Sequence, residues 1–116
     1  MRNEQGYLTI NLNYRLAPEN PFPAGLDDCI FAAEWASANA NRWGGDASRM
    51  AIGGDSAGGN LAAATTLEMA ARNSPIKFKA GLLIYGLLVR ESPVKIRALL
   101  RAEIQTLSGA LDRLYA

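Results

Sequence analysis

Apolar and polar residues alternate along Tyr7–Tyr14, and the segment is rich in residues that favour extended structure. This pattern predicts a strand. Two later runs, Met50–Gly53 and Ala80–Tyr85, are short and apolar throughout rather than alternating. Such runs are typical of strands that are covered on both faces, as in parallel sheets. The chain is therefore expected to contain three strands, the last two of them buried.

A first helix is predicted over Leu26–Asn41, where apolar residues recur at helical spacing. Its inward face would comprise Leu26, Ile30, Ala33 and Ala40, widened by Phe31 and Trp35. Asp27 and Asp28 would lie in the first turn, where the helix dipole favours negative charge. The glycine pair Gly44–Gly45 suits the end of this helix.

Two further helices complete the pattern. Gly58–Arg72, built largely of Ala, Leu and Met, predicts one of them. Ser92 and Pro93 suit the start of a C-terminal amphipathic helix. Its apolar positions, which we call the leucine stripe, are Leu100, Ile104, Leu107, Leu111 and Leu114. The order β-α-β-α-β-α predicts an α/β fold with a parallel sheet, in a single domain over residues 1–116.

Composition and charge argue against several classes of partner and binding site. Apolar residues make up 49% and charged residues 20%, and the net charge of +1 comes with no basic patch, so nucleic acid is not expected as a partner. With Cys29 as the only cysteine and no histidine, the chain can form neither an intrachain disulfide nor a Cys/His metal site, and we expect no metal and no cofactor. The longest apolar run, Ala80–Val89, is 10 residues, whereas a membrane span needs about 20. Residues 1–10 lack the apolar segment of a signal peptide, so a cytoplasmic location is expected.

The strongest chemical signal is Gly54-Asp55-Ser56-Ala57-Gly58, which matches the pattern Gly-x-Ser-x-Gly and is followed by Gly59. Between a strand and a helix, this pattern predicts a strained turn that presents the serine hydroxyl. The flanking glycines would remove side chains that collide across the turn, and the Ala57 N–H would donate to an oxyanion. The alternative is a glycine-rich turn that only packs a helix against a strand, or that binds phosphate at the helix N-terminus.

Two longer motifs surround this serine: NYRLAPENPFPAGLDDC at residues 13–29 and GGDSAGGNLAA at residues 53–63, with RWGGD between them. Together they closely resemble the hormone-sensitive-lipase-like esterases of the α/β-hydrolase fold-3 family. The resemblance covers about residues 6–85, whereas 86–116 diverge. It implies hydrolysis of small carboxylic esters with Ser56 as nucleophile, and it implies no cofactor. In the first motif, Arg15 is expected to form an ion pair with Glu19, Asp27 or Asp28.

The sequence also departs from that family. The family's H-G-G-G loop, its catalytic acid and its histidine are not in these 116 residues, and Gly86 follows Tyr85 where the family usually has a proline. The chain is therefore expected to be the central part of a larger hydrolase, with a partial fold of three parallel strands, and to be inactive alone. Without a histidine, another side chain would have to take the proton of Ser56. Asp55 is expected to point away from Ser56, and Glu68 is expected to lie too far along the helix. Lys77 and Lys79 precede the third strand, and the sequence does not place them near Ser56.

A second hypothesis is a non-catalytic module that keeps the fold and serves ligand binding or assembly. The absence of histidine favours it, and the intact serine turn speaks against it. In either case, unpaired strand edges in a partial sheet favour self-association, unless the C-terminal helix covers the exposed face.

Overall fold

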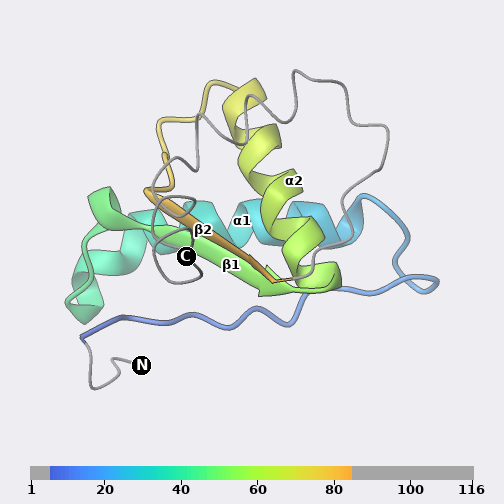
Figure 1. The fold of residues 1–116 in the computed structure, drawn as a ribbon, viewed down its shortest axis with the longest axis horizontal. Coiled ribbons are helices and arrows are strands. Elements are labelled where there is room, and N and C mark those ends of the chain that lie inside the picture. Colours follow the sequence, from blue (N-terminus) through green and yellow to red (C-terminus); the bar gives the residue numbers. More distant parts are fainter. Residues whose placement is uncertain (1–5, 85–116) are drawn as a thin grey trace, which may run out of the picture. The chain divides into compact units, whose positions relative to one another are not determined.

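The structure, a computed structural model, describes residues 6–84 (Figure 1). Contacts divide the chain after Arg49, so the described residues belong to two units, 6–49 and 50–84, which are treated separately below. Tyr85 and the predicted C-terminal helix with its leucine stripe lie outside the described residues. A single domain over residues 1–116 stays a prediction.

The second unit is a strand, a helix and a strand. Strand β1 (Ala51–Asp55) and strand β2 (Ala80–Ile84) form a parallel pair in which Ala51 lies opposite Ala80 and Asp55 opposite Ile84. Helix α2 (Ala57–Ala71) connects them and packs along the sheet (Figure 1). These bounds differ by no more than two residues from the predicted ones, and the predicted parallel pairing is confirmed.

Small side chains let α2 lie close to the sheet. Its buried residues include one glycine and several alanines and threonines, so the helix backbone can approach the strands more closely than long side chains would allow: Gly59, Ala62, Ala63, Thr65 and Thr66, with Met69 as the large exception. Phe78, just before β2, is also buried. The core of this unit is therefore built around α2.

The expectation that both strands are covered on both faces is wrong. Exposure alternates along β1 and β2, and the side chains of Leu82 and Ile84 are 47% and 42% exposed. In β2, Leu83 lies between them and is less exposed, and Gly81 is buried. An apolar run shows that both faces can be buried, but it does not show which element lies on each face.

The predicted strand at Tyr7–Tyr14 is also wrong. Within this segment only Leu8 forms an isolated bridge, and Tyr7, Ile10 and Leu12 are exposed. The two strands of the described residues are β1 and β2. A strand requires a ladder with a neighbour at about 4.8 Å. The alternating pattern specifies one strand of such a pair and not its partner.

In the first unit, helix α1 (Ala24–Asn39) continues into a 3₁₀ turn, η1 (Ala40–Trp43), and a second turn, η2, spans Ala47–Arg49. The helix starts two residues earlier than predicted, because Pro23 is accommodated at its N-cap, where no intrahelical N–H is needed. Gly44 ends η1 with φ = 77°, a left-handed conformation that favours glycine. The predicted glycine stop is thereby confirmed.

The inward face of α1 is narrower than predicted. Ile30 and Ala33 are its buried residues. Phe31 is 67% exposed, so the expectation that it widens the buried face is wrong. Trp35 is partly exposed and packs edge-to-face on Trp43, with ring centroids 5.6 Å apart. The aromatic side chains therefore pair with each other at the end of the helix.

The structure selects one partner for Arg15. Its guanidinium binds the carboxylate of Asp28 through Nη2 at 2.7 Å and Nε at 3.0 Å, and its backbone N–H donates to the same carboxylate at 2.8 Å. Asp28 lies in the second turn of α1, because the helix begins at Ala24. These contacts tie the chain before the proline-rich connection to the helix after it.

We expect this pair to make the first unit sensitive to acid. The hydrogen bonds from Arg15 hold the pKa of Asp28 below its ordinary value of 3.8. The contribution of this ion pair to the free energy of unfolding is therefore complete above pH 3.8, and it is lost as the pH falls through the lower pKa that Asp28 has in the folded state. Urea unfolding followed from neutral pH into this acid range should show a loss of stability that Asp28→Asn reduces. Glu34→Gln, on the same helix, should leave the loss unchanged; an equal effect of both variants would contradict the assignment.

A buried hydroxyl in α2 gives a second stability prediction. Thr65 Oγ1 is buried with no hydrogen-bond partner among the described residues, whereas Thr66 Oγ1 donates to the Ala62 carbonyl at 2.9 Å. Thr65→Val should raise the free energy of unfolding by about 1 kcal/mol, and Thr66→Val should lower it by about the same amount. Val and Thr have similar helix propensities, so thermal unfolding of the two variants isolates the hydroxyl. A loss of stability in Thr65→Val would contradict this account.

Candidate active site

Ser56 lies between the last residue of β1 and the first residue of α2. Its backbone has φ = 51° and ψ = −117°, a conformation that non-glycine residues rarely adopt. Its N–H donates to the carbonyl of Ile84 at 2.9 Å, which anchors the turn to the end of β2. The predicted strained turn at the carboxyl edge of the sheet is confirmed, and Ser56 is exposed there.

The two glycines of the motif have different roles. A Cβ on Gly54 would collide with the backbone carbonyl group of Gly58 and lie 2.9 Å from its Cα. A Cβ on Gly58 would meet nothing within 4 Å. Gly54 is therefore required by the close approach of β1 to the start of α2. The expectation that both glycines avoid colliding side chains is confirmed for Gly54 and wrong for Gly58.

The start of α2 supplies backbone donors beside the serine. The first helical hydrogen bond runs from the Asn60 N–H to the Ser56 carbonyl at 3.1 Å. The N–H groups of Ala57, Gly58 and Gly59 precede it and have no acceptor within the helix. Ala57 is exposed and Gly59 is buried. The partial positive charge of the helix N-terminus is thus located next to the Ser56 hydroxyl.

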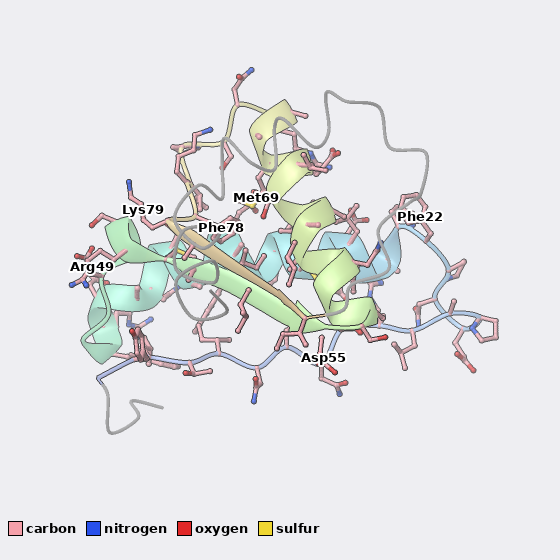
Figure 2. All side chains as sticks on the ribbon, viewed as in Figure 1. Phe22, Arg49, Asp55, Met69, Phe78 and Lys79 are labelled. Atoms are coloured by element: carbon pink, nitrogen blue, oxygen red, sulfur yellow. The ribbon has the colours of Figure 1, made fainter. Side chains whose placement is uncertain are left out.

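The structure places the side chains considered as substitute bases. Lys79 precedes β2, and its N–H donates to the Met50 carbonyl at the amino end of β1. Figure 2 shows Lys79 and Asp55 at opposite ends of the sheet. A strand of this length extends about 17 Å, so Lys79 is remote from Ser56.

The carboxylates of the second unit are placed as well. Glu68 lies about 18 Å along α2 from Ser56, and its Oε1 accepts a hydrogen bond from Arg72 Nε at 2.8 Å. It is therefore too far to act as a base, as expected. Asp55 ends β1 opposite Ile84 and is exposed. The expectation that it points away from Ser56 stays a prediction.

Sequence reasoning missed Ile84. Its carbonyl receives the Ser56 N–H, so the residue positions the serine through its backbone. In the sequence it is one of several apolar residues in a run, with nothing that marks it. Only the register of β1 against β2 brings it to Ser56.

Within residues 6–84, no three His, Cys, Asp or Glu side chains lie close enough together to hold a metal ion. No helix in the same range has the length and apolar character needed to span a bilayer.

Comparison with known proteins shows which protein family contains this serine turn. The family model for the alpha/beta hydrolase fold matches residues 1–111. The chain belongs to the fold-3 family of α/β hydrolases. Its partial α/β-hydrolase fold, with parallel strands and helices, agrees with the resemblance found in the motifs.

Esterases and a lipase are among the relatives of this fold-3 chain. It is 54% identical over 56 residues to carboxylesterase NlhH of Mycobacterium tuberculosis, covering 48% of this chain and 18% of NlhH. It is 44% identical over 68 residues to hormone-sensitive lipase of Homo sapiens, covering 59% of this chain and 6% of that protein. The chain thus matches less than a fifth of the length of either relative.

A solved structure gives a similar result. A hyperthermophilic esterase from the archaeon Pyrobaculum calidifontis matches with a TM-score of 0.60 and 45% sequence identity, over 63% of this chain and 24% of that one. The described fold and the sequence motifs therefore point to the same family.

Proposed function

We propose that this chain carries the nucleophile of a carboxylic ester hydrolase and that Ser56 is that nucleophile. The observation that carries the proposal is the backbone of Ser56, which has φ = 51° at the junction of β1 and α2. Such a strained position exposes a hydroxyl at the end of a sheet, as the nucleophile turn of α/β hydrolases requires. Strain of this kind costs free energy and persists where the surrounding structure imposes it.

In the proposed reaction, Ser56 Oγ attacks the carbonyl carbon of a small acyl ester. The carbonyl oxygen takes up the negative charge, and the Ala57 N–H donates a hydrogen bond to it. The carbon–oxygen bond to the alcohol breaks, the alcohol takes a proton, and an acyl-Ser56 ester remains. Water then attacks this ester, releasing the carboxylic acid and restoring the hydroxyl. No cofactor takes part.

The proton of Ser56 needs a base, and the 116 residues contain no histidine. In the second unit, Lys79 and Glu68 are too far from Ser56, as described above. We therefore propose that the base belongs to a longer protein that includes this chain, and that the 116-residue chain alone is inactive. A serine without a base is a poor nucleophile at neutral pH.

The rival function is a non-catalytic module that binds ligands or mediates assembly, and the same absence of histidine favours it. Such a module does not need a strained serine, so the backbone of Ser56 favours the hydrolase. A cytoplasmic location remains part of the proposal for either function.

Phosphonylation tests the assignment, because a fluorophosphonate reacts with an activated serine. In a protein that joins this chain to a downstream acid and histidine and an upstream glycine loop, mass spectrometry should find the adduct on the peptide that contains Ser56. Ser56→Ala should abolish the adduct, and Ser48→Ala should retain it. An adduct on another serine would contradict the role of Ser56, and ester binding without any adduct would favour the module.

A further inference from the structure

Two consecutive glycines, Gly53 and Gly54, lie in β1, and they meet different neighbours. Gly54 approaches the backbone at the start of α2, as described above. Gly53 lies opposite Leu82 in the parallel pair, and the atoms nearest to a Cβ built on it all belong to Leu82. A glycine inside a strand has no side chain to pack, and it often marks a position where another backbone approaches closely. Gly53 has this character toward β2.

The missing side chain of Gly53 lets the two strands lie close together. A Cβ on Gly53 would lie 3.2 Å from the Cβ of Leu82 and 3.1 Å from the Leu82 carbonyl oxygen. Both separations are tighter than nine in ten contacts that real Cβ atoms make. A Cβ and a backbone carbonyl cannot rotate away as the end of a long side chain could. Two side chains at this level would therefore hold β1 and β2 further apart.

The same two strands hold the serine turn. Ile84 lies two residues beyond Leu82 in β2, and its carbonyl accepts the N–H of Ser56 at 2.9 Å. Ser56 follows Gly53 by three residues, which is about 10 Å along an extended chain. The register of β1 against β2 is unbroken between these two points, and the strands run side by side (Figure 1). A change in strand separation at Gly53 is therefore transmitted to the hydrogen bond of Ser56.

We propose that Gly53 is a positioning residue for Ser56. By leaving out a side chain, it lets β2 approach β1 closely enough for the Ile84 carbonyl to accept the Ser56 N–H. That hydrogen bond anchors Ser56 at φ = 51°, the conformation that exposes its hydroxyl. Gly53 thus acts through β2 and not by contact with a substrate. Its catalytic consequence rests on the proposed role of Ser56 as nucleophile, whereas its effect on the Ser56 hydrogen bond does not.

A small displacement of β2 is enough for this effect. To admit a Cβ on Gly53, Leu82 would have to move by a few tenths of an ångström. The same shift would take the distance between the Ser56 nitrogen and the Ile84 oxygen beyond about 3.2 Å, the upper end of the usual range for an N–H···O hydrogen bond. Misplacing a reacting group by about 1 Å costs about a hundredfold in rate, so we expect a loss of about three- to tenfold here.

Amide hydrogen exchange in the 116-residue chain tests the effect on the turn without any catalysis. In Gly53→Ala, the Ser56 amide should exchange about tenfold faster than in the unchanged chain, because its hydrogen bond is longer. Amides in the middle of α2 report unfolding of the whole unit, and they should be accelerated much less. Equal acceleration of both would mean that the alanine only destabilises the unit. That result, or unchanged exchange at Ser56, would overturn the proposal.

Two double variants test the contact with Leu82. Leu82→Gly removes the Cβ that Gly53→Ala would meet, whereas Leu82→Ala keeps it, and both remove the rest of the leucine side chain. Combined with Gly53→Ala, only Leu82→Gly should return the exchange of the Ser56 amide toward the rate of the unchanged chain, although glycine is the poorer residue in a strand. If Gly53→Ala alone does not fold, only the double variant with Leu82→Gly should fold. Rescue by both substitutions or by neither, read as exchange or as folding, would overturn the proposal.

The catalytic consequence is measured in the longer protein described above, with a fluorophosphonate to count the reactive sites. Per reactive site, Gly53→Ala should lower kcat for a short-chain p-nitrophenyl ester by about three- to tenfold and leave KM nearly unchanged, because it misplaces the hydroxyl without removing a substrate contact. An unchanged kcat per site would make Gly53 a residue of stability alone and would overturn its positioning role. Full turnover by Ser56→Ala would instead contradict the proposed function, and hydrogen exchange would then decide the role of Gly53 by itself.

Discussion

Ser56→Ala is expected to lower ester turnover by about a millionfold in a protein that joins this chain to a downstream acid and histidine and an upstream glycine loop. The variant keeps the sheet, the helix and the backbone donors of the turn, and it loses only the hydroxyl that forms the acyl intermediate. Hydrolysis of a short-chain p-nitrophenyl ester, followed as kcat, measures the loss. The residual rate, roughly a thousandfold over water, would come from oxyanion stabilisation and substrate binding.

The 116-residue chain alone provides the complementary measurement. Because it contains no histidine, its turnover should not exceed that of its own Ser56→Ala variant. Ser48→Ala is the matched control in both proteins, since Ser48 hydrogen-bonds to Asp46 in the first unit. Turnover by the 116-residue chain well above the Ser56→Ala level would mean that a base is present in these residues. Unchanged turnover by the longer Ser56→Ala protein would remove the nucleophile assignment.

The second large effect is expected from Gly54→Ala. The added methyl group would collide with the backbone carbonyl group of Gly58, which cannot rotate away as a flexible side chain could. Relief requires β1 and the start of α2 to separate, and overpacking of this kind costs about 1–3 kcal/mol or more. We expect a corresponding loss in the free energy of unfolding, measured by urea denaturation.

Gly58→Ala is the matched control for that prediction. Its Cβ would enter open space, and alanine is favoured over glycine within a helix by about 1 kcal/mol. The variant should therefore be as stable as the unchanged chain or slightly more stable. Equal losses from both substitutions would show that the motif glycines act through a shared requirement for backbone freedom rather than through the contact between Gly54 and Gly58.

The local pattern around the serine was predictable because its causes lie within a few residues. A short apolar run, a Gly-x-Ser-x-Gly turn and an alanine-rich helix predict β1, the strained Ser56 and α2, and the structure confirms all three. Gly44 at the end of η1 is another local signal, because a left-handed residue there favours glycine.

The unequal roles of Gly54 and Gly58 were not predictable, although both belong to the same motif. Their difference depends on how closely the backbone of β1 approaches that of α2, and this distance is set by packing. The choice of Asp28 as the partner of Arg15 has a similar origin. Glu19, Asp27 and Asp28 were all close enough to Arg15 in sequence. The position at which α1 begins decides which of these carboxylates faces the Arg15 guanidinium.

The sequence by itself determined where α1, α2 and the serine turn form, because those depend on neighbouring residues, and its motifs indicated the family. The tertiary structure decided which apolar runs pair, which faces they cover and which distant backbone group holds Ser56. Tyr7–Tyr14 has the alternation of a strand but forms only an isolated bridge at Leu8, while Ile84 has no distinguishing signal and anchors the turn. Pairing and burial are relations between segments far apart in the chain, and a pattern within one segment does not contain its partner.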